Sequence, residues 1–314
     1  MWTTLIIAPI GAITMKNWIL IWVFLELSSF SFIVLSKNKS TSESILKYFL
    51  IQTLSSILIL ASIIMKMPFP TTKSMNWFLY SPILLIISLS LKSGLAPLHI
   101  WMPNVSKGLE WKSLWMFLTI QKFAPIMLML SMINILLISI IILLCSIIGT
   151  MSQMSTLELK ILLTYSSISH SSWIILGGMM KMEIFMLYMI IYSTILYQII
   201  LTLSKKSTKS IIQMKSSKTS VILFMSLGGL PPLLGFFPKW VSVLTIMSEN
   251  NMKMVCLFIL LMACLNIYIY TRILFSSILK EKEKSKNFSN SKEKPFSMFL
   301  TNSMAIPILI MFST

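Results

Sequence analysis

Long apolar segments alternate with short polar connections along the whole chain. A run of about 18 or more apolar residues is long enough to cross a lipid bilayer as an α-helix. We interpret eleven segments in this way, so the pattern predicts an all-α, polytopic membrane protein. The expected spans are 2–15, 17–36, 44–65, 77–101, 109–130, 132–152, 155–178, 182–203, 218–246, 251–276 and 296–312.

The composition agrees with this interpretation. Hydrophobic residues make up 56% of the 314 residues, charged residues make up 11%, and the mean hydropathy is +0.86. A soluble domain could not bury that much apolar surface. We therefore expect a single membrane domain over residues 1–314, in which residues 277–314 form a polar loop and the last helix.

A short motif of glycine, leucine and proline occurs twice, each time in an apolar segment that also holds a lysine. The first copy contains Gly94, Leu95, Ala96, Pro97 and Pro103 near Lys92, and the second contains Gly229, Leu230, Pro231, Pro232 and Pro238 before Lys239. Glycine and proline interrupt helices, so the motif predicts that spans four and nine are broken. Spans four and nine are an odd number of crossings apart, so the two broken helices should run in opposite directions. This relation is typical of inverted five-helix repeats, whose functional site lies at the repeat interface.

Charged residues inside the expected spans are the main functional candidates, because a charge near the bilayer centre costs at least ~2.5 kcal/mol. Glu26 and Lys122 lie mid-span, while Lys92 and Lys239 flank the two breaks. A lysine buried away from water holds its proton less tightly, and an approaching carboxylate restores that hold. The four residues could therefore pass protons along a row. The alternatives are a structural ion pair for Glu26 and Lys122, and snorkelling of Lys92 and Lys239 toward an interface.

Four further residues are weaker candidates. Lys47 and Lys160 lie near the ends of spans, where snorkelling explains a lysine at least as well as function does. His99 follows the first break, and His170 lies in a stretch rich in serine. Each histidine could relay protons or could be an ordinary buried side chain.

The net charge of +17 does not indicate nucleic-acid binding, because the lysines are spread among the connections and do not form one aromatic-interleaved face. They concentrate in the connections that follow even-numbered spans. The positive-inside rule then places this side, together with the N-terminus, in the compartment where the protein is made. An odd number of spans places the C-terminus on the opposite side.

The residue spacing does not indicate a metal or redox centre. Cys145, Cys256 and Cys264 lie in apolar segments without metal-ligand spacing, so we expect small buried side chains. The two histidines are far apart, and dinucleotide-binding and Walker motifs are absent. Any redox cofactor is therefore expected in another subunit.

Every acidic residue is glutamate and Arg272 is the only arginine. This usage suggests an AT-rich genome and hence an organelle-encoded chain.

These residues and motifs resemble the antiporter-like membrane subunits of respiratory complex I. The resemblance extends from about residue 17 to residue 275, and eleven spans match the animal form with a shortened N-terminus. The stretches that carry it are 22–26, 47–50, 92–103, 121–125, 164–170 and 228–240.

The resemblance implies proton translocation coupled to electron transfer from NADH to ubiquinone. Glu26 and Lys92 match the coupling glutamate–lysine pair, Lys122 the central relay lysine, and Lys239 the lysine of the second broken helix. His99, Lys160 and His170 match the hydrophilic axis of these subunits, and Lys47 lies in the matching stretch 47–50.

The resemblance also implies a location and partners. We expect the mitochondrial inner membrane, with the N-terminus in the matrix and the C-terminus in the intermembrane space. Expected partners are other membrane-arm subunits, including neighbouring antiporter-like subunits, and lipids such as cardiolipin. FMN, iron–sulfur clusters and ubiquinone are expected in other subunits. Two alternative functions stay open. The chain could be a stand-alone cation/proton antiporter, or a structural membrane-arm subunit without its own proton path.

Overall fold

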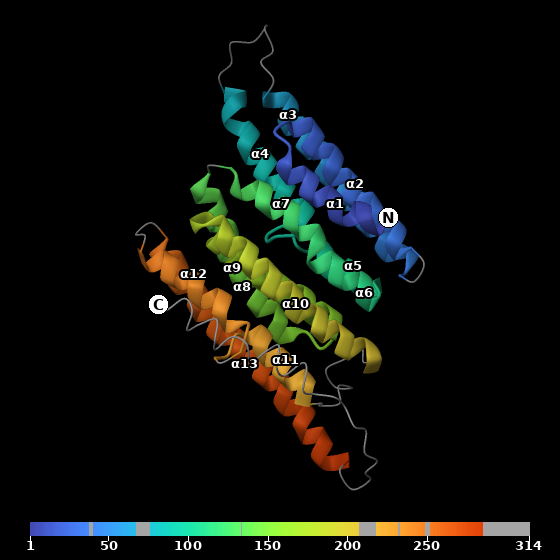
Figure 1. The fold of residues 1–314 in the computed structure, drawn as a ribbon, viewed down its shortest axis with the longest axis vertical. Coiled ribbons are helices and arrows are strands. Elements are labelled where there is room, and N and C mark those ends of the chain that lie inside the picture. The colour runs from blue at the N-terminus through green and yellow to red at the C-terminus, as the bar shows by residue number, and fades with distance from the viewer. Residues whose placement is uncertain are drawn as a thin grey trace. The chain divides into compact units, whose positions relative to one another are not determined.

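The computed structural model describes residues 1–37, 40–66, 76–132, 134–206, 218–231, 233–248 and 252–284, and every regular element within them is a helix (Figure 1). This confirms the all-α prediction. The expected last span, 296–312, and most of the expected loop and helix over 277–314 lie outside the described residues.

The described chain divides into two compact units, residues 1–145 and 146–314, and we describe each by itself. The expectation of one membrane domain over the whole chain stays a prediction. The division falls inside α8, Ile135–Ser155.

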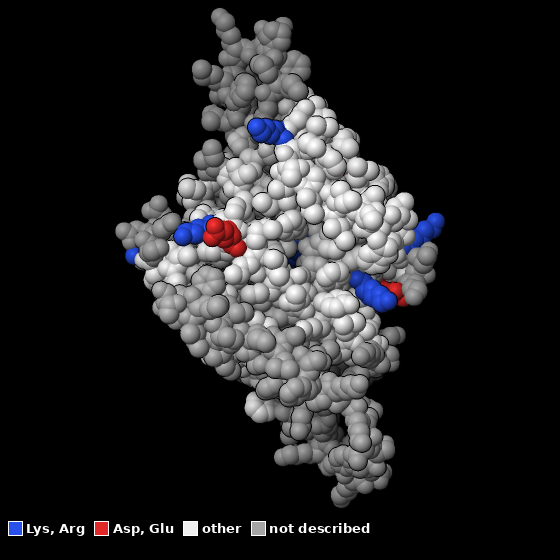
Figure 2. Space-filling view, in the orientation of Figure 1, with Lys and Arg blue, Asp and Glu red and all other residues white. Residues whose placement is uncertain are grey.

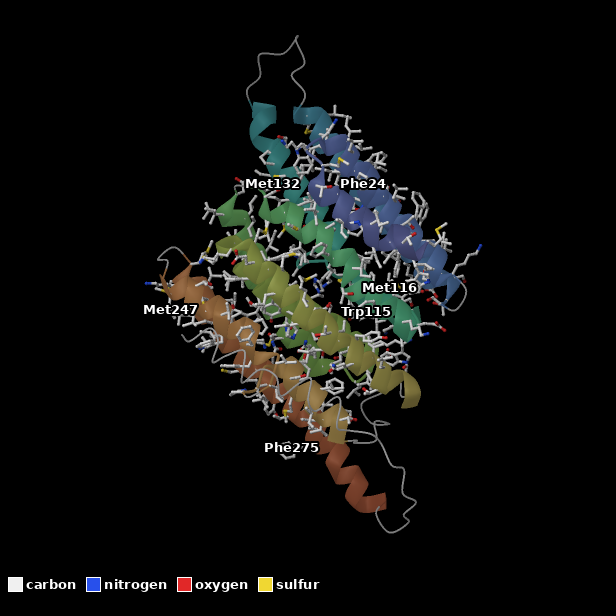
Figure 3. All side chains as sticks on the ribbon, viewed as in Figure 1. Phe24, Trp115, Met116, Met132, Met247 and Phe275 are labelled. Atoms are coloured by element: carbon white, nitrogen blue, oxygen red, sulfur yellow. The ribbon has the colours of Figure 1, made fainter. Side chains whose placement is uncertain are left out.

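The first unit places α1 against α2, α3 against α4, and α7 against both α1 and α4 (Figure 1). Gly11 lets α1 approach α2 closely, because a Cβ there would lie 2.8 Å from the ring of Phe24, which is labelled in Figure 3. The helices of this unit that precede α8 are α1 Trp2–Thr14, α2 Trp18–Ser36, α3 Ser42–Lys66, α4 Asn76–Ser93, α5 Trp101–Gly108, α6 Trp111–Leu118 and α7 Ile120–Leu130.

The second unit is built around α9, most of whose side chains are buried. Helices α10 and α12 pack on it, and α11 packs between α10 and α13 (Figure 1). Gly149 on α8 allows close contact with α9, since a Cβ there would lie 2.7 Å from the backbone nitrogen of Ser169. The helices after α8 are α9 Leu159–Met180, α10 Met182–Lys206, α11 Lys218–Gly228, α12 Phe236–Ser248 and α13 Lys253–Lys284.

Within the described residues, six helical segments are long and apolar enough to cross a membrane, and further apolar helices are shorter. The six are Trp18–Ser36, Ser42–Met65, Trp111–Leu130, Ile135–Ser155, Met182–Ser204 and Lys253–Phe275. The chain is therefore a membrane protein of several apolar helices. The count of eleven spans and their inverted arrangement stay predictions.

The surface is mainly uncharged. On the face shown in Figure 2, the Lys, Arg and Glu side chains of the described residues are few and scattered. Large aliphatic side chains on α2 and α3, such as Leu27 and Leu54, are about half exposed. An apolar outer surface of this kind suits contact with lipid, in which every backbone polar group must be satisfied internally.

Candidate functional site

Helix α4 ends at the first copy of the Gly-Leu motif. Gly94 has a φ of +67°, and its amide donates to the carbonyl of Leu91 at 3.2 Å. The amide of Leu95 donates to the carbonyl of Ser90 at 2.9 Å. These two bonds form a Schellman cap, in which glycine supplies the left-handed conformation. The chain is not helical again until α5 begins at Trp101.

Helix α11 ends in the same way at the second copy. Gly229 has a φ of +83°, and its amide donates to the carbonyl of Ser226 at 3.1 Å. The amide of Leu230 donates to the carbonyl of Met225 at 3.3 Å. Each bond joins a donor and an acceptor that are as far apart in the sequence as in the first copy. The next helix, α12, begins at Phe236. The Gly-Leu pair therefore produces one type of helix end in both units.

Lys92 lies in the last turn of α4 and is 4% exposed. Its Nζ lies 4.0 Å from Oε2 of Glu26 on α2, and it makes no hydrogen bond to the described residues. The Glu26 side chain is 16% exposed, and the Ser29 hydroxyl donates to the same Oε2 at 2.9 Å. The two predicted residues thus form an ion pair, with the lysine buried and the glutamate partly buried, whose charged atoms lie beyond hydrogen-bond distance.

Side chains from other helices bond to the backbone around the first break. The Gln52 amide on α3 donates to the carbonyl of Lys92 at 3.2 Å. The amide of Ala96 donates to the Cys145 thiol at 3.2 Å.

Cys145 and Cys256 are buried as expected, but Cys264 is exposed, so the expectation of three buried cysteines is wrong for Cys264.

Lys122 is 4% exposed and lies in the first turn of α7. Thr119, whose ψ is −72°, separates this helix from α6, the helix on which Figure 3 labels Trp115 and Met116. At this interruption the Thr119 hydroxyl donates to the carbonyl of Trp115 at 2.7 Å, a bond to the preceding turn that often bends a helix. The structure thus places Lys122 in the interior of the first unit.

Lys239 lies in the first turn of α12 and is 7% exposed. Its Nζ donates to the carbonyl of Gly228, the last residue of α11, at 2.9 Å. The C-terminal end of a helix carries partial negative charge, which favours a cation there. A Cβ on Gly229 would lie 2.9 Å from the same Nζ, so glycine also provides space for the lysine.

His170 is buried on α9, and its Nδ1 lies 2.9 Å from the hydroxyl of Tyr188 on α10. Its ring centroid lies 5.1 Å from that of Tyr192. A cavity of about 10 Å³, the space of about one water molecule, lies beside these three residues. Ser226 on α11 and Pro238 on α12 also line it. The second break therefore lies next to the predicted histidine.

The remaining candidates lie closer to the surface. Lys47 is exposed and pairs with Glu43 one helical turn earlier on α3. His99 is partly exposed between α4 and α5, and its Nδ1 lies 3.1 Å from the carbonyl of Pro97. Lys160 is partly exposed in the first turn of α9. The structure does not bring Lys47 into an ion pair with Glu26.

Several polar residues beside the candidates have contacts that their sequence positions did not lead us to expect. Ser29 bonds to Glu26, and its position three residues later on the same helix could have identified it. The Gln121 amide contacts Tyr48 and Ser28, and Tyr188 contacts His170. No group of three or more His, Cys, Asp or Glu side chains within the described ranges could hold a metal ion.

Comparison with known proteins places these features in context. Residues 15–266 match the model of the family described as NADH:quinone oxidoreductase/Mrp antiporter, TM. The chain is 33% identical to NADH-ubiquinone oxidoreductase chain 2 of Anopheles gambiae, covering 98% of this chain and 95% of that one. It is 32% identical to the protein of the same name from Artemia franciscana, covering 91% and 92% of the two chains.

Two solved structures share the fold. One chain of respiratory complex I from Thermus thermophilus matches with a TM-score of 0.77 and 19% identity, covering 96% of this chain and 74% of that chain. A chain of the Mrp complex from Dietzia sp. DQ12-45-1b matches with a TM-score of 0.73 and 14% identity, covering 85% of this chain and 57% of that chain.

Proposed function

This chain belongs to the NADH:quinone oxidoreductase/Mrp antiporter family, and from that premise we propose that its buried lysines and Glu26 carry protons across the membrane. The chain is a membrane subunit of the proton-pumping NADH:ubiquinone oxidoreductase, and it assembles with other subunits of the membrane arm. Proton transfer through this chain would be coupled to electron transfer from NADH to ubiquinone.

The observation that carries the proposal is the ion pair of the buried Lys92 and the partly buried Glu26. Lys92 Nζ and Glu26 Oε2 lie 4.0 Å apart, and the attraction between two charges depends on their distance. A shift of either side chain would therefore change this attraction. An isolated buried charge is costly, so each partner depends on the charge state of the other. A proton that arrives at or leaves one residue therefore changes the proton affinity of its partner.

The break at the end of α4 supports this role. It leaves helix-end carbonyls and a non-helical backbone beside Lys92, and such backbone is tolerated at membrane depth only inside protein or along a water-filled cavity. We propose that spans four and nine of an eleven-span protein are broken transmembrane helices. The second break, with Lys239, His170 and the small cavity, would provide the corresponding segment of the path.

The location and cofactors follow from the same proposal. The chain would lie in the mitochondrial inner membrane with its N-terminus in the matrix and its C-terminus in the intermembrane space. Neighbouring antiporter-like subunits and lipids such as cardiolipin would cover its apolar outer surface. FMN, the iron–sulfur clusters and ubiquinone would be held by other subunits.

Replacement of Glu26 by glutamine in the assembled complex tests the proposal. Glu26→Gln keeps the shape of the side chain and removes the charge beside Lys92, so we expect the rate of proton translocation to fall about tenfold or more. The measurement is acidification or alkalinisation inside liposomes that contain the purified complex and are supplied with NADH and ubiquinone. Glu183→Gln is the matched control, because Glu183 is exposed in the first turn of α10.

Two outcomes separate the candidate functions. Loss of translocation in Glu26→Gln, with wild-type translocation in Glu183→Gln, supports a proton path through this chain. Wild-type translocation in an assembled Glu26→Gln complex would instead indicate a structural subunit whose pair serves packing alone.

A further inference from the structure

Gln121 links three helices of the first unit through one side chain. It precedes Lys122 in the first turn of α7. Its Oε1 accepts a hydrogen bond from the Tyr48 hydroxyl on α3 at 3.2 Å, and its Nε2 donates to the carbonyl of Ser28 on α2 at 3.0 Å. Both partners are far from Gln121 in the sequence, so these bonds fix the packing of α7 against α2 and α3.

The contact on α2 lies next to the Glu26 carboxylate. Ser28 follows Glu26 by two residues, and the adjacent Ser29 donates to the carboxylate at 2.9 Å. The Gln121 amide is therefore bonded to the turn of α2 that carries the glutamate, while its own backbone carries the neighbouring Lys122. A shift of this amide would move the two charged residues relative to each other.

The contact on α3 is held in place by aromatic packing. Tyr48 is 1% exposed, and its ring centroid lies 4.9 Å from that of Phe32 and 5.9 Å from that of Phe117. The ring centroid of Trp101, the first residue of α5, lies 6.2 Å from that of Tyr48. A ring confined on several sides presents its hydroxyl to Gln121 in a fixed direction.

We infer that Gln121 is a positioning residue for proton transfer, which with Tyr48 holds Lys122 in its working position relative to Glu26. The inference rests on the proposed function of Glu26 and Lys122. Gln121 itself needs to gain or lose no proton in this role. Its amide acts through geometry, because it can donate to a helix carbonyl and accept from a hydroxyl at the same time.

The test is the rate of proton translocation per assembled complex in Gln121→Met. Methionine has a similar length and removes both hydrogen bonds, and a net hydrogen bond shifts an equilibrium by about two- to tenfold. We expect a decrease of about that size in translocation and in the kcat for ubiquinone reduction, with an unchanged KM for ubiquinone. A purely structural role would lower the amount of assembled complex without changing the kcat of each complex.

Ser31→Ala is the matched control. The Ser31 hydroxyl donates to the same Ser28 carbonyl at 2.8 Å but belongs to α2, so its loss leaves the link between helices intact. We expect Ser31→Ala to translocate protons at the wild-type rate. Wild-type translocation in Gln121→Met would overturn the inference, as would equal losses in the two variants.

Tyr48→Phe supplies an independent test if Gln121→Met does not assemble. It removes one hydroxyl from a ring that its neighbours hold in place, so we expect assembly and a smaller decrease in translocation. If Gln121→Met does assemble, adding Tyr48→Phe to it should cause no further decrease, because the partner of the hydroxyl is already absent. Wild-type translocation in Tyr48→Phe, or a full additional decrease in the double variant, would contradict the inference.

Lys122→Met, prepared in parallel, distinguishes failure of the inference from failure of the proposed function. If Lys122→Met loses translocation while Gln121→Met retains it, only the positioning role is wrong. If Lys122→Met itself translocates protons at the wild-type rate, the proposed function is wrong as well.

Discussion

Helices α4 and α11 end with the same backbone geometry, but the lysine beside each end has a different partner. In the first unit Lys92 lies 4.0 Å from the Glu26 carboxylate. In the second, Lys239 donates to the carbonyl of Gly228, and no carboxylate among the described residues pairs with it. A carboxylate can gain or lose a proton, whereas a backbone carbonyl cannot. The comparison indicates that the glycine motif ends the helix and that the lysine's partner determines the lysine's chemistry.

The largest expected effect comes from the backbone of the second break. A Cβ on Gly235 would lie 1.7 Å from the carbonyl oxygen of Ser226, and a backbone atom cannot move aside as a side chain can. We expect Gly235→Ala to prevent accumulation of the assembled complex. Gly94→Ala should be milder, because the Cβ would meet the flexible Met102 side chain, although its positive φ adds about 1–2 kcal/mol of strain.

Native gel electrophoresis of mitochondrial membranes measures the amount of assembled complex in both variants. Equal amounts in Gly235→Ala and wild type would show that the backbone contact at this break is not required.

The next effect separates the two lysines. Lys92→Met leaves the partly buried Glu26 carboxylate without its partner; breaking a fully buried pair costs about 3–5 kcal/mol, and the partial exposure of Glu26 lowers that cost. Lys239→Met leaves a neutral carbonyl unsatisfied, at a cost of about 1–3 kcal/mol. The thermal inactivation temperature of the complex should therefore fall further in Lys92→Met than in Lys239→Met.

The double variant Lys92→Met with Glu26→Gln sharpens this prediction. Removing both charges should recover part of the stability lost in Lys92→Met, since no unpaired charge remains. No recovery in the double variant would show that the two side chains do not act as a pair.

A smaller effect is expected at the hydroxyl that orients Glu26. The Ser29 hydroxyl shares its single proton between the Glu26 carboxylate at 2.9 Å and the Glu26 backbone carbonyl at 2.8 Å, so Ser29→Ala removes at most one hydrogen bond to a charged group, worth about 1.5–3 kcal/mol when it is fully formed. The carboxylate should become less fixed beside Lys92, and the translocation rate should fall severalfold. Ser28→Ala is the control, because the Ser28 hydroxyl bonds only to the carbonyl of Leu25 in its own helix. Equal rates in the two serine variants would exclude an orienting role for Ser29.

The smallest effect is expected in the second unit, at the contact between His170 and Tyr188. Tyr188→Phe removes a neutral hydrogen bond, which contributes about 0.5–1.5 kcal/mol. We expect a modest lowering of the inactivation temperature and a translocation rate within a few-fold of wild type. A loss as large as that in Glu26→Gln would show that this histidine is as important as the pair in the first unit.

The sequence alone predicts the backbone of the candidate site better than its contacts. The Gly-Leu motif indicates a helix end because a Schellman cap needs glycine at one defined position, and Gly94 and Gly229 occupy it. Apolar segments indicate helices because bilayer-spanning backbone must satisfy its own hydrogen bonds. The eleven-span count depends partly on residues 296–312, which lie outside the described part of the chain.

Apart from the pair of Glu26 and Lys92, which the resemblance implied, the partners of the polar residues could not be predicted in the same way. The bond from Lys239 goes to a backbone carbonyl, which every residue possesses and no sequence pattern marks. The contacts of Gln121 join residues on three helices, so they depend on how those helices pack. Local spacing finds pairs within one helix, such as Glu26 and Ser29, and does not find pairs between helices.

The most direct test of the account compares Lys122→Met with Lys112→Met in liposomes that contain the assembled complex. Lys122 is buried in α7, whereas Lys112 is exposed on the neighbouring α6. If buried lysines of this chain carry protons, Lys122→Met will assemble and lose proton translocation driven by NADH, while Lys112→Met will match the wild type. Undiminished translocation in an assembled Lys122→Met complex would contradict the account.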